Sequence, residues 1–210
     1  MELDIYGETA KLRILEKLFQ YPEREFTLSE LALEAGVAKQ NMQKIINGLQ
    51  KNKLIETARL GKRMWLIKGK QDELKFIKQK IIYNLNIIYK SGIIEILEDI
   101  FDRPKSIILF GSFRYGKDIS TSDIDIAVET PLVDKYSIVK SNDKTSKKNE
   151  SELIKKIENK IGRKFEFHLF PKLDLSDKDF KETFVSIING FVFYGFLDLK
   201  HEKGKKSVIR

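Results

Sequence analysis

The sequence predicts an α+β chain, with a helical and basic N-terminal part and a mixed sheet with flanking helices in the C-terminal part. Apolar residues recur at helical spacing in the first third of the chain. A short apolar run at residues 107–110 has the length and β-branching of a buried strand, and residues 165–170 alternate as a strand does. These observations place helices first, a connecting helix next and the sheet last.

The composition indicates a globular chain. Its 210 residues suffice for one large or two small domains, and an apolar content of 41% supports a core. There is no N-terminal apolar signal segment and no apolar run of about 18 residues, so we expect a cytoplasmic protein outside the membrane. The absence of cysteine excludes disulfides and thiolate ligands, and with two histidines we expect oxygen atoms to hold any metal ion.

Positive charge is concentrated in one segment. The whole chain has a formal net charge of +8 and a pI near 9.4. Residues 39–80 contain twelve basic residues and three acids, a net charge of +9, so this segment alone accounts for the excess. Such a segment favours contact with nucleic acid.

The N-terminal part is predicted to contain three helices and a hairpin. The first helix covers residues 8–20, and Thr27 and Glu30 have the spacing of a capping box that begins a second helix. Gly36 permits a tight turn before the third helix, at residues 39–51. The outer face of that helix carries side chains that can contact base edges and phosphates: Lys39, Gln40, Asn41, Gln43 and Lys44. Two strands follow at residues 54–58 and 63–67, with Lys62 and Arg63 at the tip between them.

This order of elements resembles a winged helix-turn-helix domain across residues 8–68. The resemblance implies a DNA-binding domain at residues 1–69, whose third helix and hairpin meet phosphates on either side of a groove. The alternative is a protein-interaction or dimerisation module with a solvated charged face. Residues 70–90 are predicted to form a connecting helix, whose apolar stripe could also be the seam of a homodimer.

A glycine–serine bend and two aspartates stand out in the stretch 105–129. Gly111 and Ser112 directly follow the apolar strand, where backbone amides can face a phosphate with no side chain in the way. Asp123 and Asp125 lie two residues apart on the next strand and so share one face. Neighbouring carboxylates repel each other unless a cation lies between them, and oxygen ligands suit Mg²⁺ carrying nucleotide phosphates.

This pattern resembles the signature of minimal nucleotidyltransferases of the DNA polymerase β-type superfamily. Arg114, Gly116 and Ser122 match further positions of that signature. The resemblance implies a nucleotidyltransferase domain at residues 91–199. The nucleotide-binding residues that it implies are Gly111, Ser112, Arg114, Lys117 and Ser122. The alternative is a pair of solvated acids beside an ordinary turn.

The resemblance also implies a third carboxylate on a later strand. Glu166 matches that place, on the predicted strand 165–170, and shares its face with His168. The family usually has aspartate there, and glutamate reaches about one methylene further. Before this strand, residues 130–150 are polar and predicted to be a loop or insertion, and residues 151–161 a helix. After it, a helix from residue 177 ends at a glycine before an apolar strand or turn, and residues 200–210 form a basic tail.

Together these features predict a Mg²⁺-dependent enzyme that moves a nucleoside monophosphate from an NTP, AMP from ATP being expected, to a hydroxyl of a macromolecular acceptor. The metal ligands would be Asp123, Asp125 and Glu166. Some members of the family adenylylate a protein in toxin–antitoxin pairs, so a toxin-like protein is a candidate acceptor. The alternative is a DNA-binding transcriptional regulator or antitoxin whose transferase-like domain binds nucleotide or a partner without turnover. The adjacent acids favour the enzyme, because an inactive site has no electrostatic reason to keep them.

Overall fold

The computed structural model describes residues 9–60, 64–140, 148–172 and 178–197. They form two compact units. Unit 1 comprises the described residues up to Asn86 together with Tyr115–Ser122, and unit 2 comprises Ile87–Arg114 and the described residues from Asp123 onward. The chain therefore leaves unit 2 after Arg114, contributes eight residues to unit 1 and returns at Asp123.

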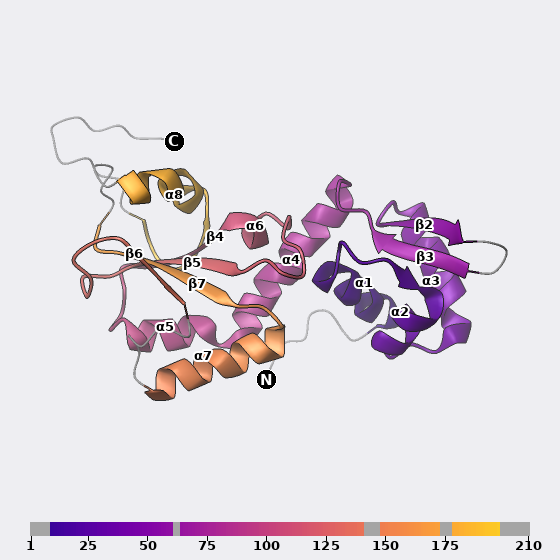
Figure 1. Cartoon of the computed structure of the whole chain (residues 1–210), viewed down its shortest axis with the longest axis horizontal. Helices are drawn as coiled ribbons and strands as arrows, with labels where there is room; N and C mark the ends of the chain where they lie inside the picture. Colours follow the sequence, from indigo (N-terminus) through magenta and orange to yellow (C-terminus); the bar gives the residue numbers. More distant parts are fainter. Residues whose placement is uncertain (1–8, 61–63, 141–147, 173–177, 198–210) are drawn as a thin grey trace. The chain divides into compact units, whose positions relative to one another are not determined.

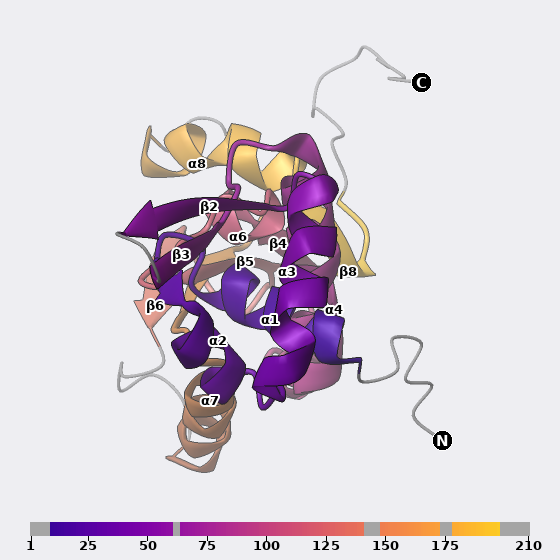
Figure 2. The ribbon, with the colours of Figure 1, turned by 90° about the vertical axis from the view of Figure 1, so that its right-hand side faces the viewer.

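Unit 1 contains three short helices, a three-stranded antiparallel sheet and the first part of a long helix. Its elements are α1 (Ala10–Gln20), β1 (Phe26–Thr27), α2 (Leu28–Glu34), α3 (Lys39–Lys51), β2 (Ile55–Leu60), β3 (Met64–Gly69) and most of α4 (Leu74–Ser91). The strand order is β1-β3-β2, and β3 pairs antiparallel with both neighbours. Figure 2 looks onto this unit, with β2 and β3 running beside one another.

The predicted capping box begins α2. The Thr27 hydroxyl accepts a hydrogen bond from the amide of Glu30 (3.2 Å), and the amide of Thr27 donates to Glu30 Oε2 (2.8 Å). This reciprocal pair satisfies amides that the first helical turn leaves unbonded. The hydrogen bonds to Thr27 also lower the pKa of the Glu30 carboxyl. Within the unit, the apolar residues of α1 and α3 are buried in one core, as their spacing predicts: Ile14, Leu15, Leu18, Phe19, Met42, Ile46 and Leu49.

A buried polar cluster joins α4 to the segment Tyr115–Ser122 inside unit 1. Lys80 is 1% exposed, and its Nζ lies 3.1 Å from Asp118 Oδ1 and also donates to the Asp118 carbonyl. Asn84 Nδ2 donates to the same carboxylate oxygen (2.8 Å). Near the other end of the segment, the amide and hydroxyl of Ser120 donate to the Glu23 carboxylate. Because a buried charge needs a partner and hydrogen bonds, these contacts hold the segment firmly against the unit.

Unit 2 is a five-stranded mixed sheet with helices. Its elements after α4 are α5 (Ile93–Ile100), β4 (Ser106–Phe110), α6 (Gly111–Arg114), β5 (Ile124–Glu129), β6 (Ser137–Lys140), α7 (Lys148–Ile161), β7 (Phe165–Phe170), α8 (Lys178–Ile188) and β8 (Phe191–Gly195). The strand order is β6-β7-β5-β4-β8; β5 and β7 run parallel, and the other neighbours are antiparallel. The chain breaks between α4 and α5 at Gly92, whose φ of 74° is left-handed.

The two faces of this sheet have different coverings. Figure 1 shows α5 and α7 on one side of the strands and α8 on the other. Under α8 a buried apolar cluster contains Ile108, Phe110, Ala127, Phe170, Phe180 and Ile187. Alternation along the strands puts Asp125, Glu166 and His168 on this same face. The face beneath α8 is therefore apolar toward one end of the strands and polar toward the other.

Candidate functional site

The acids of unit 2 are brought together by strand register. Asp125 on β5 lies opposite Glu166 on β7, and Glu166 lies opposite Lys140 on β6. Residues opposite one another on neighbouring strands share a face and lie close enough to interact. The pairing of the three strands therefore forms one row of charged side chains, with Asp123 two residues before Asp125 on the same face.

Lys140 lies between two of these acids. Its Nζ is 3.2 Å from Asp123 Oδ2 and 2.9 Å from Glu166 Oε2. Hydrogen bonds to Glu166 and Asp123 raise the pKa of Lys140, so the ammonium form is the one present. A positive charge thus occupies the place between the carboxylates of Asp123 and Glu166.

Asp125 is the acid whose charge is least favoured. Burial raises the pKa of the Asp125 carboxyl to about 6, and the negative charges of Glu166 and Asp123 add to the effect, while Lys140 opposes it. Burial and the two neighbouring charges penalise the ionised form, and a nearby cation would offset that penalty. The carboxyl is therefore poised to bind positive charge.

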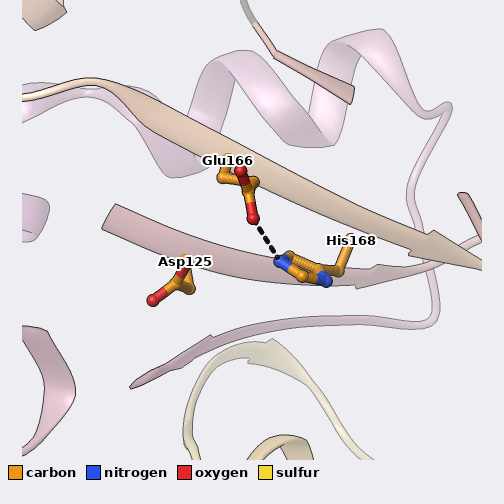
Figure 3. Close-up of side chains that lie close together, drawn as sticks. All are labelled: Asp125, Glu166 and His168. Carbon is orange, nitrogen blue, oxygen red and sulfur yellow. Dashed lines mark ion pairs between the residues drawn. The ribbon is translucent and has the colours of Figure 1, made fainter. Parts of the chain in front are cut away.

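His168 completes the cluster from the buried side. One ligand atom from each of Asp125, Glu166 and His168 lies within 4.8 Å of the others. Figure 3 shows the three side chains on neighbouring strands, with a nitrogen of the His168 ring facing Glu166. That contact joins His168 Nε2 and Glu166 Oε1 at 3.3 Å. Burial lowers the pKa of the His168 imidazole, against the opposing effect of Glu166.

The predicted glycine–serine bend lies beside Asp125. Gly111 opens α6 directly after β4 with a φ of 69°, a conformation that favours glycine. A β-carbon at this position would collide with the Asp125 carboxylate, so glycine is required by contact as well as by conformation. Ser112 follows in the same turn and is half-buried. The bend and the acids therefore form one continuous surface in unit 2.

The other sequence-predicted residues lie in different places. Arg114 ends α6 in unit 2, whereas Lys117 and Ser122 belong to the segment that packs in unit 1. The Ser122 hydroxyl accepts a hydrogen bond from the amide of Ile119 (3.0 Å), so in this structure it serves the local turn. The predicted α3 residues Lys39, Gln40, Asn41, Gln43 and Lys44 are all exposed. Lys62 and Arg63 lie outside the described residues, as does the tail 200–210.

Sequence reasoning missed Lys140. The polar stretch 130–150 is predicted as a loop, but it contains β6, which pairs with β7 and delivers Lys140 to the acids. The signal for this strand is short: Ile138 and Val139 are the β-branched residues of a four-residue element. Otherwise β6 is stabilised by its pairing with β7, and a pattern of neighbouring residues does not reveal that pairing.

The residues present fit a divalent cation. Asp125 and Glu166 lie opposite one another, and a lysine ammonium lies between Glu166 and Asp123 as a stand-in positive charge. Oxygen ligands of this kind suit Mg²⁺ or Mn²⁺. The adjacent left-handed glycine brings the backbone of the bend directly against the Asp125 carboxylate, so phosphates held by a cation at that carboxylate would lie close to the bend.

Residues 90–188 match the family model described as Nucleotidyltransferase domain. Over these residues the chain is similar to nucleotidyltransferase domains. The match spans the bend at Gly111 and all three acids, and it supports an enzyme of the nucleotidyltransferase class. The predicted resemblance to nucleotidyltransferases is thereby confirmed at the level of the domain.

The comparisons with curated proteins and with solved structures add no argument about function. No curated protein matches the chain. Among solved structures, a mutant of ZitR from Lactococcus lactis matches with 18% identity over 47% of this chain and 65% of that chain, and its TM-score of 0.34 is too low to carry an argument. Within the described residues, no helix combines the length and the apolar character needed to cross a membrane.

Proposed function

We propose that the nucleotidyltransferase domain moves a nucleoside monophosphate, AMP from ATP, to a hydroxyl group of a macromolecular acceptor. The observation that carries this proposal is the opposition of Asp125 and Glu166 beside the left-handed bend at Gly111, within a stretch that matches the family model. Asp123 binds the same lysine ammonium as Glu166. A carboxylate cluster in contact with a glycine turn suits a metal-bound triphosphate.

Each group of the site has a task in the reaction. The backbone of Gly111 and Ser112 holds the phosphates, while Asp123, Asp125 and Glu166 hold the metal ion. Mg²⁺, when bound, neutralises phosphate charge and favours attack at the α-phosphorus. The acceptor oxygen forms a bond to that phosphorus, the bond to the bridging oxygen of the β-phosphate breaks, and pyrophosphate leaves with the electron pair. Glu166 takes the proton of the attacking hydroxyl.

Lys140 also has a place in this scheme. Its ammonium balances Asp123 and Glu166 before a cation binds, and its exposed side chain (55%) can turn toward solvent or phosphate afterwards. An ammonium close to a transferring phosphoryl group stabilises the charge that develops there. Arg114 and Lys117 remain proposed contacts for the β- and γ-phosphates.

We further propose that unit 1 is a winged helix-turn-helix domain that contacts DNA. Three helices followed by the β2–β3 hairpin support the assignment, as do the exposed polar side chains of α3. In such a complex α3 enters the major groove and the region around Lys62 and Arg63 meets the adjacent backbone. The acceptor would then be a nucleic acid or a protein partner held near it, a toxin-like protein among the candidates.

Nucleotide turnover tests the enzyme directly. Pyrophosphate release is measured with Mg²⁺ and each of ATP, CTP, GTP and UTP, for the wild type and for the double variant Asp123→Ala/Asp125→Ala. Labelled nucleotide is then offered with an extract of the source cells, and labelled protein and nucleic acid are sought. Mg²⁺-dependent transfer that the double variant lacks supports the enzyme. Nucleotide binding without any transfer favours the alternative, a DNA-binding regulator or antitoxin whose transferase-like domain only senses nucleotide.

A further inference from the structure

The imidazole of His168 is placed as a ligand would be. It lies on β7, is 5% exposed, and packs edge-on against Phe110 with ring centroids 4.8 Å apart. Within the described part of the chain, its buried Nε2 makes no hydrogen bond of good geometry. The same atom points into the acid cluster, 3.3 Å from Glu166 Oε1 (Figure 3). Buried polar nitrogens are rarely left without a partner.

A tyrosine hydroxyl lies at the opposite edge of the ring. His168 Nδ1 lies 2.6 Å from the Tyr136 hydroxyl, and that hydroxyl donates to Thr183 Oγ1 at 3.4 Å. When the Tyr136 proton is directed to Thr183, its oxygen can accept from a protonated Nδ1. The neutral ring then has a bare lone pair on Nε2 that faces the Glu166 carboxylate. Two lone pairs in this position repel unless a cation lies between them, and a hydrogen bond to one ring nitrogen is how proteins orient a metal-binding histidine.

We infer that Asp125, Glu166 and His168 form a binding site for a first-row transition-metal dication, for which Mn²⁺ serves as the probe, with His168 Nε2 as a nitrogen ligand. The three ligand atoms lie within 4.8 Å of one another, close to the span of about 4 Å between opposite ligands of such an ion. Small side-chain adjustments close the difference. The site departs from the oxygen-only site expected from the sequence.

The two carboxylate oxygens of Glu166 contact different residues of the cluster. Oε1 faces His168, and Oε2 faces Lys140, which also contacts Asp123. The nitrogen-containing site therefore lies on one side of Glu166 and the lysine-filled position on the other. Mg²⁺ prefers oxygen ligands alone, whereas imidazole raises the affinity for transition ions. The inference rests on the proposed function and deepens it, because it names the class of metal ion that this transferase would prefer.

Mn²⁺ binding to the full-length, nucleotide-free chain tests the inference. The Kd of Mn²⁺ and of Mg²⁺ is measured by calorimetry, and the spin-echo spectrum of bound Mn²⁺ is examined for nitrogen modulation. The wild type is expected to show that modulation. In His168→Gln the modulation disappears and the Kd for Mn²⁺ rises on the order of tenfold, while the Kd for Mg²⁺ changes by less than about threefold. The matched control is His201→Gln, which removes the other histidine of the sequence.

A second variant tests whether a loss of metal binding is caused by misfolding. His168→Phe keeps an aromatic ring beside Phe110, and circular dichroism checks both variants. Absence of nitrogen modulation in the wild type, or equal losses of Mn²⁺ and Mg²⁺ affinity in a folded variant, overturns the inference. Turnover is a separate readout. Nitrogen modulation without nucleotide transfer would contradict the proposed function but support the metal site. Nucleotide transfer without nitrogen modulation would support the proposed function but contradict the metal site.

Discussion

The ammonium nitrogen of Lys140 lies 2.9 Å from Glu166 Oε2, where it would compete with a metal ion for the same carboxylate. Replacing Lys140 by methionine removes the competing charge, so we expect Mg²⁺ to bind the nucleotide-free chain more tightly. Exposed ion pairs contribute up to about 1 kcal/mol, which limits the gain to about fivefold. Calorimetry measures the change. Lys140→Arg keeps the charge and Lys135→Met removes an exposed charge elsewhere; unchanged affinity in Lys140→Met would exclude the competition.

The ionised form of Asp125 is expected to cost stability in the metal-free protein. Its folded pKa of about 6 lies above the ordinary 3.8, so the folded state binds the proton more tightly and loses stability as pH rises between these values. Asp125→Asn should therefore stabilise the fold by about 1 kcal/mol more at pH 7.5 than at pH 5. Urea denaturation followed by circular dichroism measures this. The exposed Asp134→Asn is the control, and an equal effect at both pH values would contradict the prediction.

Gly111→Ala should slow nucleotide transfer. The substitution costs about 1 kcal/mol in backbone conformation, and its β-carbon displaces the Asp125 carboxylate. A shift of about 1 Å in a positioned group lowers the transfer rate on the order of 100-fold. Gly36→Ala is the matched control, since its φ of 60° carries the same conformational cost with open space around it. Steady-state pyrophosphate release distinguishes them, and equal losses in both variants would refute the positional argument.

Lys80→Met should destabilise unit 1 by about 3 to 5 kcal/mol. The change leaves the Asp118 carboxylate buried without its counter-charge. Lys80→Met/Asp118→Asn removes that charge and keeps an acceptor for Asn84, so most of the stability should be recovered. The single tryptophan of the chain, Trp65, lies in β3 of this unit and reports its unfolding by fluorescence. A double variant no more stable than the single one would count against the charge as the cause.

Neutralising α3 should weaken DNA binding. Lys39→Ala/Lys44→Ala removes two exposed positive charges from the helix proposed to enter the major groove. Affinity should fall by a similar factor for all DNA sequences. The slope of log affinity against log salt concentration should become less steep by about one for each phosphate that the helix no longer neutralises. A salt-titrated gel shift gives both quantities. Lys155→Ala/Lys156→Ala removes two exposed charges from α7 as the control, and identical curves for both double variants would argue against α3.

The sequence pattern predicts most of the fold because its signals are local. The capping box at Thr27, the amphipathic third helix and the strand carrying Glu166 each depend on neighbours within a few residues. All three recur in the structure. The opposition of Asp125 and Glu166 agrees with the predicted cluster of acids, since both lie on apolar strands with period two.

The features that the sequence pattern does not predict depend on residues that are distant in the sequence. Lys140 reaches the acids only because β6 pairs with β7, and His168 becomes a candidate ligand only once Tyr136 is seen at its other nitrogen. Lys80 has the pattern of one more exposed cation in a basic segment, yet it is buried against Asp118, 38 residues later. Side chains paired across such separations leave no periodic trace in the sequence.

The buried cluster of Lys80, Asn84 and Asp118 has a consequence for how the chain is made. As the polypeptide emerges from a ribosome, the first eighty-odd residues contain the apolar core of unit 1 but cannot yet pair Lys80 with Asp118, because that carboxylate is still to be translated. By the time it arrives, β4 and the bend at Gly111 have already left the exit tunnel. The N-terminal unit is therefore expected to mature only when the central part of the transferase is being synthesised, so that the two folding events overlap in time.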